Sequence, residues 1–377
     1  MDLIKEGISI LEERKLRFVA RFIPYFLSSY GAHNFNLINR MVKAYTSFGR
    51  VPDTRLQILF TAPPGWSKSM FLKQLLNETY GLVNNGQVPV RFAGSVTEAA
   101  WTGSASSQGG VMVPEPGLAE KYKTGIVGME EFKAITIMME STHSSHLEQA
   151  LAMSLFEGDV EKDLKGAPIA YHTDVTIWAG NQIMNFSLSG GLFRRFFQVF
   201  WTPRLSEAQE MEDAVWDGDN VPFNHTRLVN YRMELDRMTT RLKGVTKVQY
   251  SDDFRKSLHG VPHFEKSLYK CFALGYTVMS DTNLGPHLII ECPRELNELI
   301  NTAIIWRKQL LADPKGYQVE SLLYDLGAAD EDVAWADVRD KNLLFSVSFE
   351  ETDQILKTLL LSGRVKYTTS GRKLRLA

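Results

Sequence analysis

A strand, a short loop and a helix in succession at residues 55–76 limit the possible folds of this chain most strongly. The segment RLQILFTAP at 55–63 is an apolar run that ends in proline, so we predict a buried strand that enters a loop. Residues 70–76 continue in a helical pattern. The intervening loop ends in Lys-Ser, and that pair between an apolar strand and a helix predicts a phosphate-binding loop.

This loop, APPGWSKS, carries groups that suit a magnesium-bound triphosphate. In such a loop the backbone N–H groups would face the phosphates, Lys68 would contact the β and γ phosphate oxygens, and the hydroxyl of Ser69 would bind magnesium. The dipole of the following helix adds positive potential. Ala62 and Ser67 replace the two glycines of G-x-x-x-x-G-K-[ST], and the alternative is a turn with a chance Lys-Ser pair. We expect ATP and Mg²⁺ as cofactors, with contacts from Pro64, Gly65, Trp66, Ser67, Lys68, Ser69 and Met70.

Further apolar segments alternate with helical ones along the chain. Strands are predicted at 88–95, 124–132, 174–182 and 196–203, and a helix is predicted at 146–158. This alternation predicts an α/β fold with a mostly parallel five-stranded sheet that is covered on both faces. We expect a helical lead-in at 1–50, a nucleotide-binding α/β domain at 51–205, a helical lid at 206–312 and a winged-helix domain at 313–377.

Polar side chains end two of the predicted strands. Glu130 and Glu131 follow an apolar strand, where the first acid of a phosphate-loop ATPase holds the magnesium shell and the second activates water. Glu130 is one methylene longer than the aspartate that is usual there. Asn181 ends the next strand and could orient the water. The alternatives are surface glutamates that begin a helix, and an asparagine that only forms a turn.

Two arginine positions are candidates for contact with the transferred phosphate. Arg194 and Arg195 precede an apolar strand, and one of them could enter a neighbouring subunit's site. Arg294 begins a predicted lid helix after a proline and could contact the γ-phosphate. The alternative for each is a solvated surface arginine.

Composition excludes several classes of protein. The net charge of −2 argues against a protein coated in basic charge, although a ring could concentrate a few lysines in its channel. Its 2 cysteines form neither a disulfide framework nor a zinc site. There is no apolar run of about 18 residues, and the first residues include acids, so we expect no membrane span and a cytoplasmic protein.

The ordered motifs resemble the minichromosome maintenance (MCM) family of hexameric AAA+ replicative helicases over about residues 23–311. WSKSMFLKQLL resembles the family's phosphate loop, in which alanine precedes the lysine and the helix reads S-x-F/L-L-K. TGIVGMEEFKAI resembles G-I-C-C-I-D-E-F-D-K-M. The resemblance implies an AAA+ α/β domain, a helical lid and a C-terminal winged helix.

Later motifs extend the resemblance to the two arginines. LFRRFF places Arg195 on the finger arginine of L-L-S-R-F-D, and CPRELNELI places Arg294 on the sensor-2 arginine of T-P-R-Q-L-E. The sequence departs from the family at Ala62, at Glu130 and around Arg195. It also implies a short form without the N-terminal DNA-binding tier, which puts strand separation and processivity in question.

The resemblance implies DNA contacts inside a central channel. The family places a hairpin there, which falls at 158–174 in this sequence, and a helix-2 insert, which falls at about 111–122. Six copies of one lysine would form a ring of positive charge. The alternative is an ordinary exposed hairpin, and a winged helix can also dock protein. The expected DNA contacts are Lys162, Lys165, Arg372 and Lys373.

Three functions are consistent with these motifs. The first is an ATP-dependent DNA translocase or helicase in DNA replication, which acts as a homo-oligomeric ring, expected to be a hexamer, with DNA and replication loading proteins as partners and a nucleoid location. The second is a MoxR-like AAA+ protein remodeller. The third is a degenerate ring subunit that binds nucleotide with little hydrolysis.

Overall fold

The computed structural model of this chain describes most of its residues. All statements below concern these ranges: 1–38, 53–94, 96–132, 145–162, 168–183, 195–217, 223–281, 283–345, 347–368 and 373–377.

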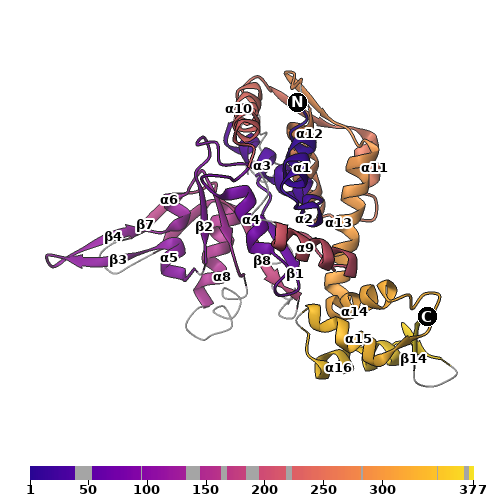
Figure 1. Ribbon diagram of the computed structural model, residues 1–377. Coiled ribbons are helices and arrows are strands. Elements are labelled where there is room, and N and C mark those ends of the chain that lie inside the picture. The colour runs from indigo at the N-terminus through magenta and orange to yellow at the C-terminus, as the bar shows by residue number, and fades with distance from the viewer. Residues whose placement is uncertain are drawn as a thin grey trace.

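A five-stranded, all-parallel sheet forms the centre of the molecule, in the order β2-β5-β8-β1-β9 (Figure 1). Its strands are β1 (Ile58–Ala62), β2 (Val90–Ala93), β5 (Ile126–Met129), β8 (Thr176–Gln182) and β9 (Phe197–Phe200). Each lies within a segment predicted as a strand, so the mixed α/β fold with a parallel sheet is confirmed. The strands are almost fully buried except β2 at the edge, as expected for a sheet covered on both faces.

Alternate residues of each strand pack against different helices, because successive side chains point to opposite faces. On one face Leu59, Val127 and Ile177 pack with α5 (Glu98–Thr102), α6 (Leu118–Lys121) and α8 (Ser145–Ala152). On the other face Phe60 and Trp178 pack with α3 (Ile23–Ile38) and α4 (Lys68–Leu76).

The connections reverse direction at β1 and β8. From β1 the chain passes through α4 to the far edge at β2, then returns through β5 to β8, and finally crosses β1 to reach β9. Right-handed crossovers in opposite directions place α4 and the later helices on opposite faces. The carboxyl ends of β1 and β8 therefore border a topological switch point, where ligands of open α/β sheets bind.

Among the described residues, two β-hairpins lie between α5 and β8 in the chain. The pair β3 (Gly103–Gln108) and β4 (Val111–Pro116) projects far from the body (Figure 1). A π-helical turn (Met153–Glu157) leads from α8 into the pair β6 (Asp159–Lys162) and β7 (Ile169–His172). The insert expected at 111–122 is thus the second half of a hairpin followed by α6.

The N-terminal helices pack against the helices that follow the sheet. These are α1 (Leu3–Glu13), α2 (Arg17–Ala20) and α3 on one side, and α10 (His225–Leu242) and α12 (Lys266–Ser280) on the other. The helices α3 and α12 touch at Gly275, where an added Cβ would lie 1.7 Å from the carbonyl oxygen of Ser28. Only glycine permits this approach, so the lead-in and the lid share one core.

The predicted helical lid contains strands that the sequence pattern did not reveal. Its further helices are α9 (Leu205–Asp217), α11 (Asp252–Ser257) and α13 (Arg294–Ala312). The strands β10 (Lys247–Tyr250) and β11 (His287–Ile290) form a parallel pair. Both are short, so an all-helical reading of 206–311 was wrong at these residues.

The C-terminal unit, residues 314–377, lies below α13 in Figure 1. It comprises α14 (Pro314–Asp325), β12 (Val333–Ala334), α15 (Trp335–Asn342), a 3₁₀ turn (Leu343–Phe345), α16 (Phe349–Leu361), β13 (Val365–Tyr367) and β14 (Lys373–Leu376). The strands pair antiparallel in the order β12-β14-β13, which confirms the predicted strands near the C-terminus. Of the helices in the described ranges, none has the length and apolar character needed to cross a membrane.

Candidate functional site

The β1–α4 loop, residues 63–67, joins the buried strand to the helix at the switch point. The helix α4 begins at Lys68, so the lysine and Ser69 lie in its first turn, where unpaired N–H groups and the helix dipole favour anions. Two residues of the loop have left-handed backbone conformations, Gly65 with φ of 78° and Ser67 with φ of 48°. Both positions favour glycine, but the second is occupied by Ser67, whose left-handed conformation costs about 1–2 kcal/mol.

The side chain of Lys68 is turned back onto its own loop. It is 7% exposed, and its Nζ donates to the carbonyl oxygens of Ala62 at 3.1 Å and Pro63 at 2.7 Å. Burial lowers the pKa of Lys68 to about 8, and the carboxylate of Glu131 opposes that shift. At neutral pH the lysine is therefore an ammonium whose hydrogen-bond partners are two neutral carbonyl oxygens, and an anion would bind it more strongly.

The tandem glutamates lie across from Lys68 at the end of β5. An added Cβ at Gly180 of β8 would lie 2.5 Å from the carbonyl oxygen of Glu130 and 3.7 Å from the Cβ of Lys68. The loop, the end of β5 and the end of β8 therefore meet at one place. Glu130 is exposed there and Glu131 is half-buried.

One oxygen of Glu131 is held and the other is unused. Its Oε2 accepts a hydrogen bond from Nε2 of Gln182 at 2.8 Å, whereas its Oε1 is buried without a partner among the described residues. The hydroxyl of Thr61, next to β8 in the sheet, is also buried and unpaired. Unpaired buried polar atoms are costly, and they are typical of sites that bind a ligand or water.

Gln182 is a site residue that the sequence analysis missed. We expected Asn181 to orient the water, and it lies buried on β8 opposite Thr61. The side chain one position later, Gln182, is the one that contacts Glu131. Because neighbouring residues of a strand face opposite sides, only the register could distinguish them.

The groups available for a metal ion are a hydroxyl and a carboxylate. Ser69 lies half-buried in the first turn of α4, and Glu130 follows β5. Among the described residues no group of three or more His, Cys, Asp and Glu side chains could hold a metal by itself. This donor set fits Mg²⁺, which keeps several waters and takes further oxygens from phosphates.

A pocket of about 490 Å³ opens beside the start of α4. Ser67 and Met70 line it, as expected for nucleotide contacts, and Trp66 and Pro64 do not. Its volume lies in the range of small-molecule sites. The other lining residues come from the N-terminal segment, from α4 and the turn after it, and from α9 and the segment after it: Arg14, Leu16, Phe18, Gln74, Thr79, Tyr80, Met211, Ala214, Val215 and Phe223.

Arg14 supplies the positive charge of this pocket and was not identified from the sequence. Its Nη1 donates to Oε1 of Gln74 at 2.7 Å and to the carbonyl oxygen of Tyr80 at 3.0 Å. Burial lowers the pKa of Arg14 to about 10, which leaves it charged at neutral pH. Its guanidinium lies 5.0 Å from the ring of Phe223.

Of the three candidate arginines, Arg194 lies outside the described residues, and neither Arg195 nor Arg294 reaches the β1–α4 loop. Arg195 lies just before β9, whereas the loop follows the adjacent parallel strand β1. Arg195 and the loop therefore lie at opposite ends of these two strands. Arg195 is exposed and stacks on Phe156 at 5.2 Å. Arg294 begins α13 and pairs with Glu298 at 2.8 Å, and its side chain is 92% exposed. In this conformation Arg294 faces solvent, and its role as a nucleotide contact stays a prediction.

The expected DNA contacts are only partly described. Lys165 and Arg372 lie outside the described residues. Lys162 is the last residue of β6, near the tip of the hairpin as expected, but it is not a free cation because it pairs with Glu98 at 2.9 Å. Lys373, the first residue of β14, is exposed.

The site was compared with known proteins through the whole sequence. No model of a known protein family matches the chain. No curated protein matches it significantly either.

The buried ammonium of Lys68 should make stability depend on pH. The pKa of Lys68 is about 8 in the folded chain, against an ordinary lysine pKa of 10.5, so between these pH values the unfolded chain binds more protons. Stability should therefore rise from pH 8 to 10.5, by up to about 3 kcal/mol from this group. Urea unfolding at several pH values should show a rise that Lys68→Met lacks. Equal pH dependence in both proteins would contradict the assigned burial.

Proposed function

We propose that this protein is an AAA+ ATPase that resembles the MCM motor and binds Mg-ATP at the β1–α4 loop. The observation that carries the proposal is the position of Lys68, at the start of a helix and within electrostatic reach of Glu131. A cation and an acid that meet at the switch point of a parallel sheet suit phosphoryl transfer to water. The strand order, with the loop on a central strand, supports this fold.

Each residue has a role that follows from its position. Lys68 would leave the carbonyl oxygens of Ala62 and Pro63 and bind the β and γ phosphates, where the charge is stronger. The unpaired Oε1 of Glu131 would accept a proton from the attacking water while Gln182 holds Oε2. Ser69 and Glu130 would hold Mg²⁺ and its water shell, and this ion would neutralise charge on the phosphates.

The pocket beside α4 would take the nucleoside. It begins at Ser67, directly next to Lys68, so a phosphate chain at the helix N-terminus leads into it. Phe18, Met70 and Met211 provide apolar contacts for a base. Arg14 contributes positive potential at the same wall.

Ring assembly is supported by the opposite positions of the two charged groups. Arg195 cannot serve the loop of its own chain, so it could act only on a neighbouring copy. Such a head-to-tail contact is heterologous, and it forms a ring when the rotation between neighbours closes. Val215, which is 74% exposed, lines the pocket beside α4, and together with the adjacent Trp216, which is 78% exposed, it would provide an apolar surface for that neighbour.

Mixing two inactive variants should restore ATP turnover if Arg195 acts across subunits. Lys68→Ala removes nucleotide binding from one chain, and Arg195→Ala removes the arginine from another. In a mixed ring some sites combine an intact loop with an intact arginine, so turnover should recover to as much as about a quarter of the wild-type rate. Turnover that stays at the level of the separate variants would contradict action in trans.

The C-terminal unit has the element order of a winged helix, with three helices and a three-stranded sheet. Its third helix, α16, carries Glu350, Glu351 and Asp353, of which Glu351 pairs with Lys315 and Asp353 pairs with Arg339, and its own cation is Lys357. This helix therefore offers little free positive charge to DNA phosphates. Any duplex contact would therefore use the strands, through Lys373 and the neighbouring Lys366.

A second candidate function, remodelling of proteins in the MoxR-like manner, is favoured by the β3–β4 hairpin. No lysine or arginine occurs from Gly103 to Pro116. Val111 and Met112 beside its turn are 65% and 39% exposed. An apolar, uncharged tip suits contact with protein better than contact with DNA phosphates.

ATP turnover measured without DNA, with single-stranded DNA and with forked DNA separates these functions. Stimulation by DNA is expected for the MCM-like motor. Turnover that is indifferent to DNA supports the remodeller. Binding of ATP without turnover supports the degenerate subunit. In that case the replacement of the two glycines, and of the usual aspartate by Glu130, would have abolished hydrolysis.

A further inference from the structure

The β1–α4 loop is also part of the contact with the C-terminal unit. Trp66 of the loop is 1% exposed and stacks on Phe345 with ring centroids 5.2 Å apart. It also meets the edge of Trp201 at 5.4 Å. Buried aromatic pairs of this kind hold surfaces together firmly. A change in the conformation of the loop would therefore alter its packing against the C-terminal unit.

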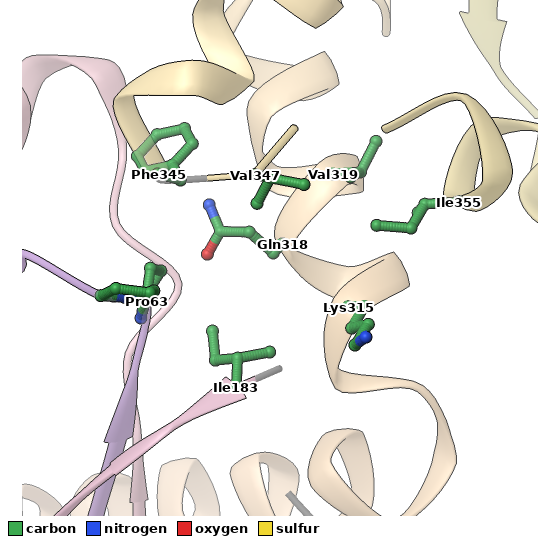
Figure 2. A pocket seen from close by; sticks show the side chains of 9 residues that line it. Pro63, Ile183, Lys315, Gln318, Val319, Phe345, Val347 and Ile355 are labelled. Atoms are coloured by element: carbon green, nitrogen blue, oxygen red, sulfur yellow. The ribbon is translucent and has the colours of Figure 1, made fainter. Parts of the chain in front are cut away.

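Gln318 of α14 points into an apolar cavity at this contact. The residue is 3% exposed, and neither its Nε2 nor its Oε1 has a hydrogen-bond partner among the described residues. Figure 2 shows its amide directed toward the side of the cavity where Pro63 and Phe345 lie. The other lining residues are Pro64, Ile183, Lys315, Val319, Val347 and Ile355.

The surroundings of Gln318 leave it few partners. Lys315 is the other residue with a polar side chain in the cavity wall, and its Nζ pairs with Oε1 of Glu351 at 2.9 Å. The prolines have no N–H, so their backbone provides only carbonyl acceptors. Two unpaired buried atoms of an amide are costly, which points to a second state in which the Nε2 donor is paired with a carbonyl acceptor.

The carbonyl oxygen of Pro63 is the acceptor in this cavity wall whose donor would be lost if Lys68 moved. In this structure Lys68 donates to it at 2.7 Å. When Lys68 turns to a triphosphate, that oxygen loses its donor. Gln318, whose N–H groups are unused, lines the same cavity as Pro63.

We propose that Gln318 is a positioning residue that takes over the Pro63 carbonyl when Lys68 turns to the triphosphate. The inference rests on the proposed nucleotide site. It makes docking of the C-terminal unit tighter in the nucleotide-bound state, because a hydrogen bond from Nε2 of Gln318 to the Pro63 carbonyl satisfies one of the two unpaired amide atoms. By reciprocity, a docked C-terminal unit raises the affinity of the loop for nucleotide.

The test compares Gln318→Met, which keeps the shape and removes the amide, with Gln354→Met on the exposed side of α16 as the matched control. In the empty wild-type background, Gln318→Met should raise the melting temperature by about 1–3 °C, because it removes unpaired polar atoms. In the Lys68→Ala background Pro63 already lacks its lysine donor, so Gln318 can pair without nucleotide. There Gln318→Met should lower the melting temperature instead.

Nucleotide binding provides the second readout. Gln318→Met should weaken Mg-ATP binding about fivefold, the value of one hydrogen bond, and Gln354→Met should leave it unchanged. The inference would be overturned if Gln318→Met shifted the melting temperature equally in both backgrounds. It would also be overturned if the wild type bound Mg-ATP and Gln318→Met bound it with the same affinity. Gln318→Leu repeats the test if the methionine variant does not fold.

Failure of the proposed function gives a different pattern. A wild type that binds no Mg-ATP would overturn the nucleotide site itself. The melting comparison with Lys68→Ala needs no nucleotide, so it still decides whether Gln318 and Lys68 share the Pro63 carbonyl.

Discussion

Replacing Lys68 with alanine is expected to abolish ATP turnover, with a loss of at least about a hundredfold in kcat/KM. The reason is that Lys68 is the charged side chain in the first turn of α4 and is buried, and its hydrogen-bond partners among the described residues are the carbonyl oxygens of Ala62 and Pro63. Without it, the charge that develops on the phosphates has no fixed cation near the helix N-terminus. Phosphate release from Mg-ATP under saturating conditions measures the effect.

Lys73 provides a matched control for this variant. It lies on the same helix, is exposed, and its ammonium lies 5.3 Å from the ring of Phe92. Lys73→Ala removes an equal charge from α4 and should leave turnover within about twofold of the wild type. Equal losses in both variants would contradict a specific role for Lys68.

Replacing Glu131 with glutamine is expected to lower turnover by about 10²–10⁴-fold while Mg-ATP still binds. Glutamine keeps the size of the side chain and removes the carboxylate that accepts a proton from water. Its Oε1 is the buried, unpaired oxygen of the site, and Oε2 is already occupied by Gln182. Single-turnover hydrolysis separates this loss from binding, which is measured by titration.

Glu130→Gln is the comparison for that variant, since Glu130 is exposed at the adjacent position. Its expected effect is a higher magnesium requirement with a smaller fall in the maximum rate, because it would act on the ion and its waters. If Glu130→Gln eliminates hydrolysis and Glu131→Gln preserves it, the two roles assigned here are reversed.

The strands of the central sheet could be predicted because each is a short apolar run with a clear end. The segment at 55–63 contains β1, and the Lys-Ser pair after it begins α4. Glu130 and Glu131 follow β5 directly, so parallel strands bring them to the same edge as Lys68. These local patterns carry enough information to place the loop and the acids together.

Other features depend on contacts between distant residues and could not be predicted. The pairing of Gln182 with Glu131 depends on register, and the pairing of Arg14 with Gln74 depends on how α1 lies against α4. The docking of Phe345 on Trp66 joins residues far apart in the chain. No periodicity in the sequence encodes such contacts.

The position expected for Arg294 illustrates the limit of a motif. Its Cys-Pro-Arg context suits a helix start, and Arg294 does begin α13. That helix spans 19 residues, so it is roughly 28 Å long, and its far end leads to α14 and the β1–α4 loop. A motif predicts the helix start correctly and cannot specify which end of the helix faces the site.

Calorimetric titration of the wild-type chain with Mg-ATP, and separately with AMP, tests the central claim most directly. The account predicts one Mg-ATP per chain with micromolar or tighter affinity, and binding of AMP that is at least about a hundredfold weaker, since Lys68 and the start of α4 hold the outer phosphates. Absence of Mg-ATP binding, or equal affinity for AMP, would contradict it.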